Sequence, residues 1–577
     1  MNAARFDALT RRLGTLPFRR ARATGPRAAL KPPGGREHPD LQRRSPGDLI
    51  ASEEITAPDD PSFPPGARAW RVRYVSTGRD NTVNTLVSGV IVAPADPARL
   101  AVHDDAGTPT GRVVAWTHGT LGIIQRCQPS ENPAQEIWGP APFGINQIAW
   151  GSEAHGDAHA GRPEDGMLAG MIDQGWIVAA TDYASEVSGD GALQPFVIGK
   201  IEAANAIDCI RAAHALLAGL HDGYAAAAYD VVTWGHSQGG HAAMWTGQLL
   251  AEYVAATGRT GDPALALSGV VLEAPASNLV APPGAEGSGL LDWTAHAALQ
   301  LTGQPVAIPL APFFFSYIFA AWARQSATGT PDPSAMPAFP ATGALDLDAV
   351  VTSEALPTVA AMPGYCWADG EQVATLAAPY ATTPFLTPAL ASGSVIGGRQ
   401  RGNVDRICGP DGAPPPALAA WCAWIRANDP GPHGVHPFAR LPARNGLPVP
   451  ILITAGTNDG VVHCVAPDPT ADAIPAATDC APVALYDALR TEYCPSGGDT
   501  GHLTLLIWRQ EAGMTTADHS DVTGLIGAAS VDDLRFQGSP LETFMRGAFA
   551  GTLGHGCTAQ VANGSARSRS GDGTIPS

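Results

Sequence analysis

The residues best suited to chemistry stand in the run Gly235-His236-Ser237-Gln238-Gly239, a G-x-S-x-G pattern. The pattern alone is weak, because glycine and serine are common. Here it follows an apolar run at residues 231–234 and precedes a helical pattern at 240–253. A serine on a sharp turn between a strand and a helix exposes its hydroxyl at the end of the strand. The sequence therefore predicts that Ser237 is a nucleophile rather than an ordinary serine in a glycine-rich turn.

A serine hydroxyl reacts only when a base takes its proton and an acid orients that base. For a serine on such a turn, the chain order is serine, acid, histidine. We expect Asp459 to be the acid, because it lies at the tip of an Asn/Gly turn that follows the apolar run 451–454. The alternative acid is Glu273, which ends the preceding apolar run.

Two histidines compete for the role of the base. Functional loops in this kind of sheet follow the carboxyl ends of strands. His519 follows the apolar run 503–508, whereas His502 begins it, so we expect His519 to be the base. His463, just after Asp459, is expected to be a loop side chain or a supporting contact.

The negative oxygen that forms during acyl transfer needs two backbone N–H groups to stabilise it. One is expected from Gln238, the residue after the nucleophile. The other is expected from Thr120, in the turn that follows the apolar run 113–116. His118 in the same turn is interpreted mainly as a structural residue.

These residues need a scaffold that brings strand ends together. Residues 70–75 and 85–92 have the pattern of a β-hairpin. Short apolar runs then recur near residues 113–116, 176–180, 231–234, 269–272, 450–454 and 503–508, with a helical pattern between 195 and 220. Continuous apolar runs separated by helices indicate a mostly parallel sheet covered by helices on both faces.

One interruption of this pattern is long enough to need its own structure. Residues 276–446 contain amphipathic stretches at 290–301 and 312–324, and we interpret them as an inserted, mainly helical cap. The expected organisation is a leader at 1–60, a first core part at 61–275, the cap, a second core part at 447–557 and a tail at 558–577. The Arg-rich leader and the Gly/Ser-rich tail are predicted to be disordered.

The composition excludes several classes of protein. The chain has 577 residues and a formal net charge of −19, which argues against a nucleic-acid binder. Hydrophobic residues make up 45% and charged residues 15%, so a large core can form. The sequence contains no GxGxxG, Walker, HExxH or EF-hand pattern, and we therefore expect no cofactor and no metal ion.

The cysteines point to an oxidising compartment. Of the nine, Cys209 lies in an apolar helical pattern and is expected to be a buried thiol. The other eight fall in loops or at element ends, which suggests four disulfides. Cys408/Cys422 and Cys464/Cys480 are the candidate local pairs, and the full connectivity stays open. A typical apolar signal segment is not evident near the N-terminus. The secreted or periplasmic location is therefore predicted from the cysteine usage alone at this point.

At this point the chain resembles the secretory lipase family of α/β-hydrolases. The resemblance spans roughly residues 65–557, and the cap matches poorly. It rests on Trp116-Thr117-His118-Gly119-Thr120 with Cys127-Gln128-Pro129-Ser130, Thr181-Asp182-Tyr183, Phe196-Val197-Ile198-Gly199, Asp208-Cys209-Ile210-Arg211-Ala212, the segment 235–240, Asn458-Asp459, His519 and residues 545–551. It implies an α/β-hydrolase fold, export, and hydrolysis of acylglycerols or other carboxylic esters by Ser237, Asp459 and His519.

We therefore expect a lipase or esterase acting on a small-molecule or lipid ester. The cap is rich in large apolar residues, including the run Phe313-Phe314-Phe315. They either pack the cap onto the core or form a surface for acyl groups and transient contact with a lipid interface. An acyltransferase or a serine peptidase with the same triad is the alternative, and a non-catalytic binding protein is a fourth interpretation. The sequence does not fix the acyl chain length or the oligomeric state.

Overall fold

The computed structural model describes most of the chain between residues 41 and 562. Outside the described residues lie 1–40 and 563–577, short stretches including 56–62, 78–83, 186–192 and 221–225, most of 134–165, 281–288, 300–307, 328–343, most of 402–413 and 431–446, 496–500, and most of 510–535. Most of the predicted leader and tail therefore lies outside the described residues.

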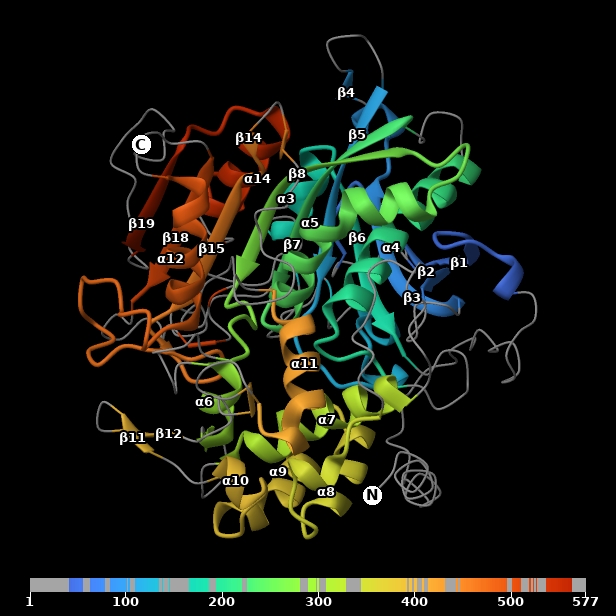
Figure 1. The fold of residues 1–577 in the computed structure, drawn as a ribbon. Helices are drawn as coiled ribbons and strands as arrows, with labels where there is room; N and C mark the ends of the chain where they lie inside the picture. The colour runs from blue at the N-terminus through green and yellow to red at the C-terminus, as the bar shows by residue number, and fades with distance from the viewer. Residues whose placement is uncertain are drawn as a thin grey trace.

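A large sheet of eleven strands forms the centre of the described structure (Figure 1). Ten strands lie side by side in the order β1-β2-β3-β6-β5-β7-β8-β15-β18-β19, and β4 pairs with β5. Pairing is antiparallel from β1 to β6 and parallel from β6 to β19. The strands are β1 Leu49–Glu54, β2 Ala67–Thr77, β3 Asn84–Pro94, β4 Val102–His103, β5 Pro109–Thr117, β6 Ile177–Ala184, β7 Ala228–His236, β8 Ala264–Glu273, β15 Ile451–Gly456, β18 His502–Trp508 and β19 Gly556–Ala562. The predicted hairpin and the mostly parallel sheet are confirmed.

Helices cover both faces of this sheet, as the apolar runs of the strands require. Alternate side chains of one strand enter different clusters, so Val231 packs with helices α4 (Gly199–Leu220) and α5 (Gln238–Thr257), whereas Val232 packs with α3 (Met167–Asp173) and α14 (Pro540–Ala550). Helix α12 (Ala481–Tyr493) packs over β8, β15 and β18. Burial on both faces is the reason that these strands read as continuous apolar runs.

A separate apolar cluster lies beyond the sheet and contains the cap helices. These are α6 Leu290–His296, α7 Ala311–Ala327, α8 Leu356–Ala361, α9 Gly370–Ala377, α10 Pro388–Ala391 and α11 Ala419–Asn428. They lie together at one end of the molecule, toward which β7 and β8 run (Figure 1). The short pairs β9–β10 (Ala298–Leu299, Ile308–Pro309) and β11–β12 (Ser394–Ile396, Arg399–Arg401) belong to the same part of the chain, whereas β13–β14 (Ala443–Arg444, Leu447–Pro448) directly precedes β15.

Two predictions of disorder at the chain ends were partly wrong. Within the predicted leader, residues 49–54 form β1, which pairs with β2 at one edge of the sheet. Within the predicted tail, residues 558–562 belong to β19, which extends the sheet beyond β18. Both are edge strands. An edge strand can have an apolar pattern on only one face, and a crosslink can add to its stability. Here Cys494–Cys557 fastens the start of β19.

The structure contains four disulfides, as the cysteine pattern predicted. The two local pairs, Cys408–Cys422 and Cys464–Cys480, are confirmed. The long-range pairs are Cys127–Cys366 and Cys494–Cys557. Cys209 is a buried free thiol within α4, also as expected. Among the described residues, no helix is both long and apolar enough to span a membrane.

Candidate active site

Ser237 stands on the turn between β7 and α5, in a backbone conformation that is unusual for serine. Its φ of 59° and ψ of −117° lie outside the regions that L-residues prefer. Two backbone hydrogen bonds hold it there. The Ser237 N–H donates to the Glu273 carbonyl at 2.8 Å, and the Ser237 carbonyl accepts from the Ala276 N–H at 3.0 Å. The serine is thus fixed between the ends of β7 and β8.

The two glycines of the motif are required by close backbone contacts. A Cβ atom on Gly239 would lie 1.9 Å from the Thr117 carbonyl oxygen, and one on Gly235 would lie 2.2 Å from the Gly239 carbonyl oxygen. The Thr117 hydroxyl also donates to the Gly239 carbonyl oxygen at 2.8 Å. The start of α5 therefore packs directly against the end of β5, where the turn that carries Thr120 begins.

Asp459 and His519 form a buried pair. His519 Nδ1 lies 2.8 Å from Asp459 Oδ2. The other carboxylate oxygen, Oδ1, accepts from the N–H groups of Val461 and Val462, both at 2.9 Å. Burial alone would raise the pKa of Asp459. The His519 imidazole and the two N–H groups outweigh this effect and lower the pKa below its usual value, which keeps the carboxylate ionised.

A second histidine connects this pair with the turn of Ser237. His236 precedes Ser237, and its ring lies 4.5 Å from the His519 ring, centroid to centroid. His236 Nε2 lies 2.7 Å from the His519 carbonyl oxygen and must donate to it, because a carbonyl can only accept. Burial and the nearby His519 lower the pKa of His236 to about 3. A neutral His236 thus holds the segment of His519 against the residue that precedes Ser237, a role that sequence reasoning missed.

The loop of Asp459 is held from several sides. Strand β16 (Asn458–Asp459) pairs with β17 (Cys464–Val465), and Cys464–Cys480 closes the loop. Trp293 from cap helix α6 donates from Nε1 to the Gly460 carbonyl at 2.9 Å. The Trp293 ring stacks on His463 at 4.2 Å with an interplanar angle of 6°. His463 is therefore a buried contact between the cap and the loop that carries Asp459 (residues 458–465, the acid loop).

The alternative acid and base lie in other surroundings. Glu273 is buried and accepts from the indole N–H of Trp234 at 2.6 Å. His502 stands at the start of β18, and its Nδ1 donates to the Gly554 carbonyl at 2.8 Å. The hydrogen bond of Asp459 to His519 thus joins the two residues that were preferred from the sequence.

His118 lies in the turn between β5 and Thr120. It is buried, and its Nδ1 donates to the Gly119 carbonyl at 2.6 Å. Its ring packs on Tyr183, with 4.6 Å between the centroids. Burial lowers the pKa of His118 to about 4, so the imidazole is neutral. These contacts agree with the structural role expected for it.

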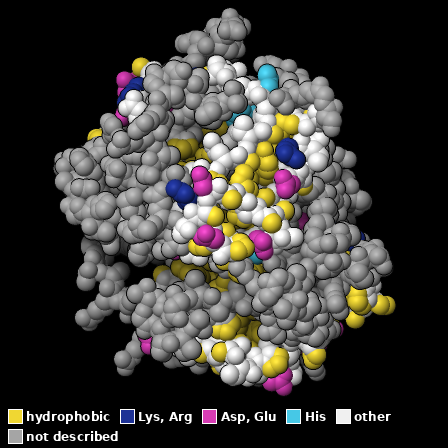
Figure 2. Space-filling model, turned by 90° about the vertical axis from the view of Figure 1, so that its left-hand side faces the viewer, with side chains coloured by type: hydrophobic (Ala, Val, Ile, Leu, Met, Phe, Trp, Pro, Cys, Tyr) yellow, Lys and Arg dark blue, Asp and Glu magenta, His cyan; other side chains and the backbone are white. Residues whose placement is uncertain are grey.

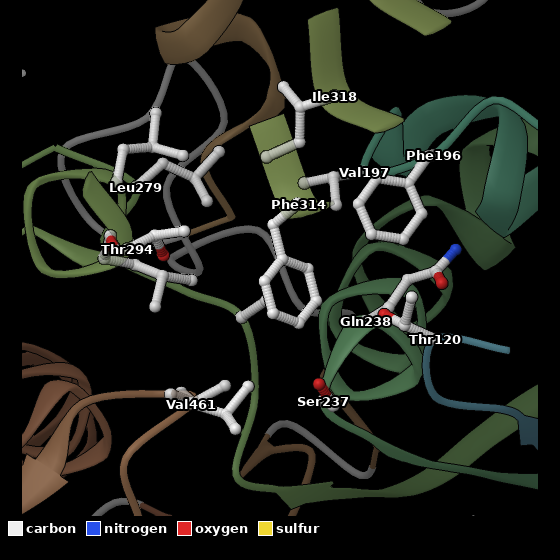
Figure 3. A pocket seen from close by; sticks show the side chains of 14 residues that line it. Thr120, Phe196, Val197, Ser237, Gln238, Leu279, Thr294, Phe314, Ile318 and Val461 are labelled. Carbon is white, nitrogen blue, oxygen red and sulfur yellow. Dashed lines mark hydrogen bonds between the residues drawn. The ribbon is translucent and has the colours of Figure 1, made fainter. Parts of the chain in front are cut away.

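Ser237 lines an apolar pocket between the core and the cap (Figure 3). The pocket is small, with a cavity volume of about 40 Å³. Its walls come from the turn after β5, the segment before α4, the start of α5, the residues after β8, cap helices α6 and α7, and the acid loop. The lining residues are Thr120, Phe196, Val197, Ser237, Gln238, Ala276, Leu279, Leu290, Leu291, Thr294, Phe314, Ile318, Val461 and Val462, and none of them is charged.

Most of the aromatic cap residues pack inside the cap. Phe313, Phe315 and Trp322 are almost fully buried. Phe314 and Ile318 on α7 instead line the pocket, and the ring of Phe314 points toward Ser237 in Figure 3. Cap residues thus serve both as core and as pocket wall.

Comparison with known proteins gives one family match and several similar structures. The model of the secretory lipase family matches residues 157–287, which include the nucleophile turn. No curated protein sequence matches. Among solved structures, the chain is similar to lipase A of Candida antarctica, with 15% identity over 91% of this chain and 88% of that chain, and a TM-score of 0.50.

Other similar structures have lower TM-scores. A rice cell wall degrading esterase, LipA from Xanthomonas oryzae, shares 16% identity over 83% of this chain and 94% of that chain, with a TM-score of 0.46. A putative hydrolase from Legionella pneumophila shares 14% identity over 82% of this chain and 93% of that chain, with a TM-score of 0.43. The predicted fold and the predicted resemblance are confirmed: this chain is an α/β-hydrolase related to the secretory lipases and is a carboxylic ester hydrolase.

Proposed function

We propose that the chain hydrolyses carboxylic esters with an apolar acyl group through an acyl-enzyme on Ser237. The observation that carries this proposal is the juxtaposition at one pocket: a serine on a strained turn lines it, and that turn contacts a buried histidine–aspartate pair through His236. Acylglycerols are the proposed natural substrates. The four disulfides and the family match support a secreted or periplasmic location.

The proposed reaction has two displacement steps. Ser237 Oγ attacks the ester carbonyl carbon while His519 Nε2 takes the hydroxyl proton, and the resulting oxyanion accepts from the N–H groups of Gln238 and Thr120. The ester C–O bond breaks as His519 returns the proton to the leaving alcohol. Water then attacks the acyl-enzyme in the same way, releases the carboxylic acid and restores Ser237. Asp459 holds the imidazole with Nδ1–H toward its carboxylate.

The pocket favours this activity over a serine peptidase with the same triad. A peptidase that recognises a peptide terminus needs a charged group near the nucleophile. None of the fourteen lining side chains among the described residues carries a charge. An acyltransferase would share the acyl pocket and differ only in using an alcohol in place of water, so it is an outcome of the assay below.

Contact with a lipid interface belongs to this proposal as well. On the face shown in Figure 2, apolar side chains lie together between scattered acidic and basic ones. The large apolar side chains that are exposed among the described residues are Ile50, Leu220 and Ile474, and none of them lies on a cap helix. This contact is tested by comparing hydrolysis rates on soluble and emulsified esters of the same acyl length. Equal rates would refute the proposed contact with a lipid interface.

The test of the proposal compares the wild type with Ser237→Ala. The wild type should hydrolyse p-nitrophenyl esters and react with a fluorophosphonate probe, and the variant should lose both. The residual rate should not exceed the roughly 10³–10⁴-fold acceleration over water that binding and the oxyanion hole provide. Full activity in the variant would refute the proposal. Ester formation with an added alcohol in preference to hydrolysis would point to the acyltransferase.

A further inference from the structure

A buried carboxyl group that the proposed mechanism does not use lies beside the pocket. Glu202 is in the first turn of α4, and its side chain has 0% exposure. Its Oε1 accepts from the Val197 N–H at 3.0 Å and from Gln238 Nε2 at 2.7 Å. Its Oε2 lies 3.0 Å from His241 Nδ1. One side chain thus contacts three residues, Val197 before α4 and Gln238 and His241 on α5, and such a buried carboxyl is costly unless it is fully hydrogen-bonded.

The two residues that donate to Oε1, Val197 through its backbone and Gln238 through its side chain, both line the pocket. Gln238 follows the nucleophile, and its N–H is one of the two proposed oxyanion donors. Val197 lines the pocket with a φ of 54°, which is strained for a β-branched residue. Such strain persists only where surrounding contacts impose it. In Figure 3, Val197 and Gln238 lie on the same side of the pocket as Thr120.

The third contact reaches the cap. His241 lies one turn after Gln238 on α5, and its Nε2 donates to the Asn428 carbonyl at 2.7 Å. Trp245, one further turn along, donates from Nε1 to the same oxygen at 3.1 Å. Asn428 is the last residue of α11. Through His241, Glu202 is therefore connected to the place where the chain leaves the cap helices.

We propose that Glu202 is a positioning residue that fixes the oxyanion-hole N–H of Gln238 and the pocket wall at Val197, and that it links both to the end of the cap. The proposal rests on the proposed esterase function and adds a residue to it. Glu202 acts through geometry and not through charge, since a negative charge near the developing oxyanion would oppose catalysis.

Glutamine at this position separates geometry from charge. Its amide oxygen can accept from Val197 and Gln238 as Oε1 does. Its NH2 group can donate to His241 Nδ1, while His241 Nε2–H continues to donate to Asn428. Glu202→Gln should therefore retain kcat within about threefold. Glu202→Ala should lower kcat by about 10–100-fold with little change in KM, because a displaced donor affects the transition state.

The matched control is Asp208, another fully buried carboxylate on α4. It accepts from Ser76, Tyr253 and Arg211 and does not line the pocket. Asp208→Ala should lower the midpoint of thermal unfolding as Glu202→Ala does, but it should leave kcat per labelled active site close to that of the wild type. A purely structural role of Glu202 would make the two variants alike.

The experiment measures kcat and KM on p-nitrophenyl butyrate for all variants, normalised to sites labelled by fluorophosphonate, together with affinity for an alkyl boronic acid as a transition-state analogue. Boronate affinity should fall in parallel with kcat in Glu202→Ala and recover in Glu202→Gln. If Glu202→Ala does not fold, Gln238→Ala, which removes one contact of the same carboxyl, should show a smaller loss of the same kind. Unchanged kcat in Glu202→Ala, or equal losses in the alanine and glutamine variants, would overturn the proposal. Failure of the wild type to hydrolyse esters would instead refute the proposed function.

Discussion

Replacement of Asp459 by asparagine tests the proposed histidine orientation, because the structure dictates which way the amide must face. Asp459 Oδ1 accepts two backbone N–H groups, from Val461 and Val462, and Oδ2 faces His519 Nδ1. Asparagine has one acceptor oxygen and one NH2 group. An NH2 in the Oδ1 position would leave two buried N–H donors unpaired, at about 1–3 kcal/mol each. The amide oxygen therefore takes the Oδ1 position and the NH2 faces His519.

The consequence for His519 follows from this orientation. The NH2 donates to Nδ1, which must then be unprotonated, so the proton of a neutral imidazole sits on Nε2. That nitrogen can no longer accept the proton of Ser237. We expect kcat to fall by about 10⁴-fold, or about 5.5 kcal/mol of barrier. KM and the thermal midpoint should change little, because the pocket and the backbone hydrogen bonds are retained.

The assay is the steady-state hydrolysis of p-nitrophenyl butyrate at pH 7–8, with circular dichroism to follow unfolding. Asp459→Ala should be less damaging than Asp459→Asn, because alanine does not impose the wrong tautomer. Glu273→Gln is the control for the alternative acid, and it retains an acceptor for Trp234. A loss below tenfold in Asp459→Asn, or an equal loss in Glu273→Gln, would refute the reasoning.

Three further predictions address the pocket, the acid loop and stability. Phe314→Ala should deepen the acyl pocket and shift the preferred p-nitrophenyl ester to longer acyl chains. Because burial of one methylene contributes about 0.8 kcal/mol, kcat/KM should rise about fourfold for each added methylene. An unchanged chain-length optimum would contradict this prediction. Trp293→Phe should keep the stacking on His463 but lose the hydrogen bond to Gly460, so kcat should fall a few-fold at constant KM, and a change in KM alone would count against this role. The pKa of His118 is about 4 in the folded protein and about 6.5 in the unfolded chain. Between these two pH values the unfolded state binds more protons, so the free energy of unfolding should fall as the pH drops from about 6.5 to 4. Urea titrations should show a shallower decline in His118→Asn, and an identical slope would be inconsistent with a neutral buried imidazole.

Sequence patterns predicted those parts of the structure that depend on neighbouring residues. The run before Ser237 and the turn at Asp459 carry their own signals, because an apolar strand and a turn are local features. The mostly parallel character of the sheet followed from the same runs. The local disulfide Cys464–Cys480 was also within reach, because its two cysteines lie 16 residues apart.

Contacts between distant segments could not be predicted in this way. Glu202 meets Gln238 across 36 residues, and His241 meets Asn428 across 187, and nothing in the spacing of these residues indicates either contact. The role of His236 was missed because its partner is a backbone carbonyl, which leaves no trace in the sequence. Strand β19 was missed because its small and polar residues, Gly556–Ala562, lack an apolar run.

The bridge between Cys127 and Cys366 restricts how a bulky ester could reach the buried serine. It joins the chain shortly after Thr120 to the cap across 239 residues, and the Trp367 N–H donates to the Leu121 carbonyl beside it at 2.8 Å. Because the disulfide crosslinks the cap to the core at this corner, the cap cannot separate from the core there. A large ester would therefore have to enter away from this corner, and the pocket of Ser237 lies where α6 and α7 meet the loop of Asp459.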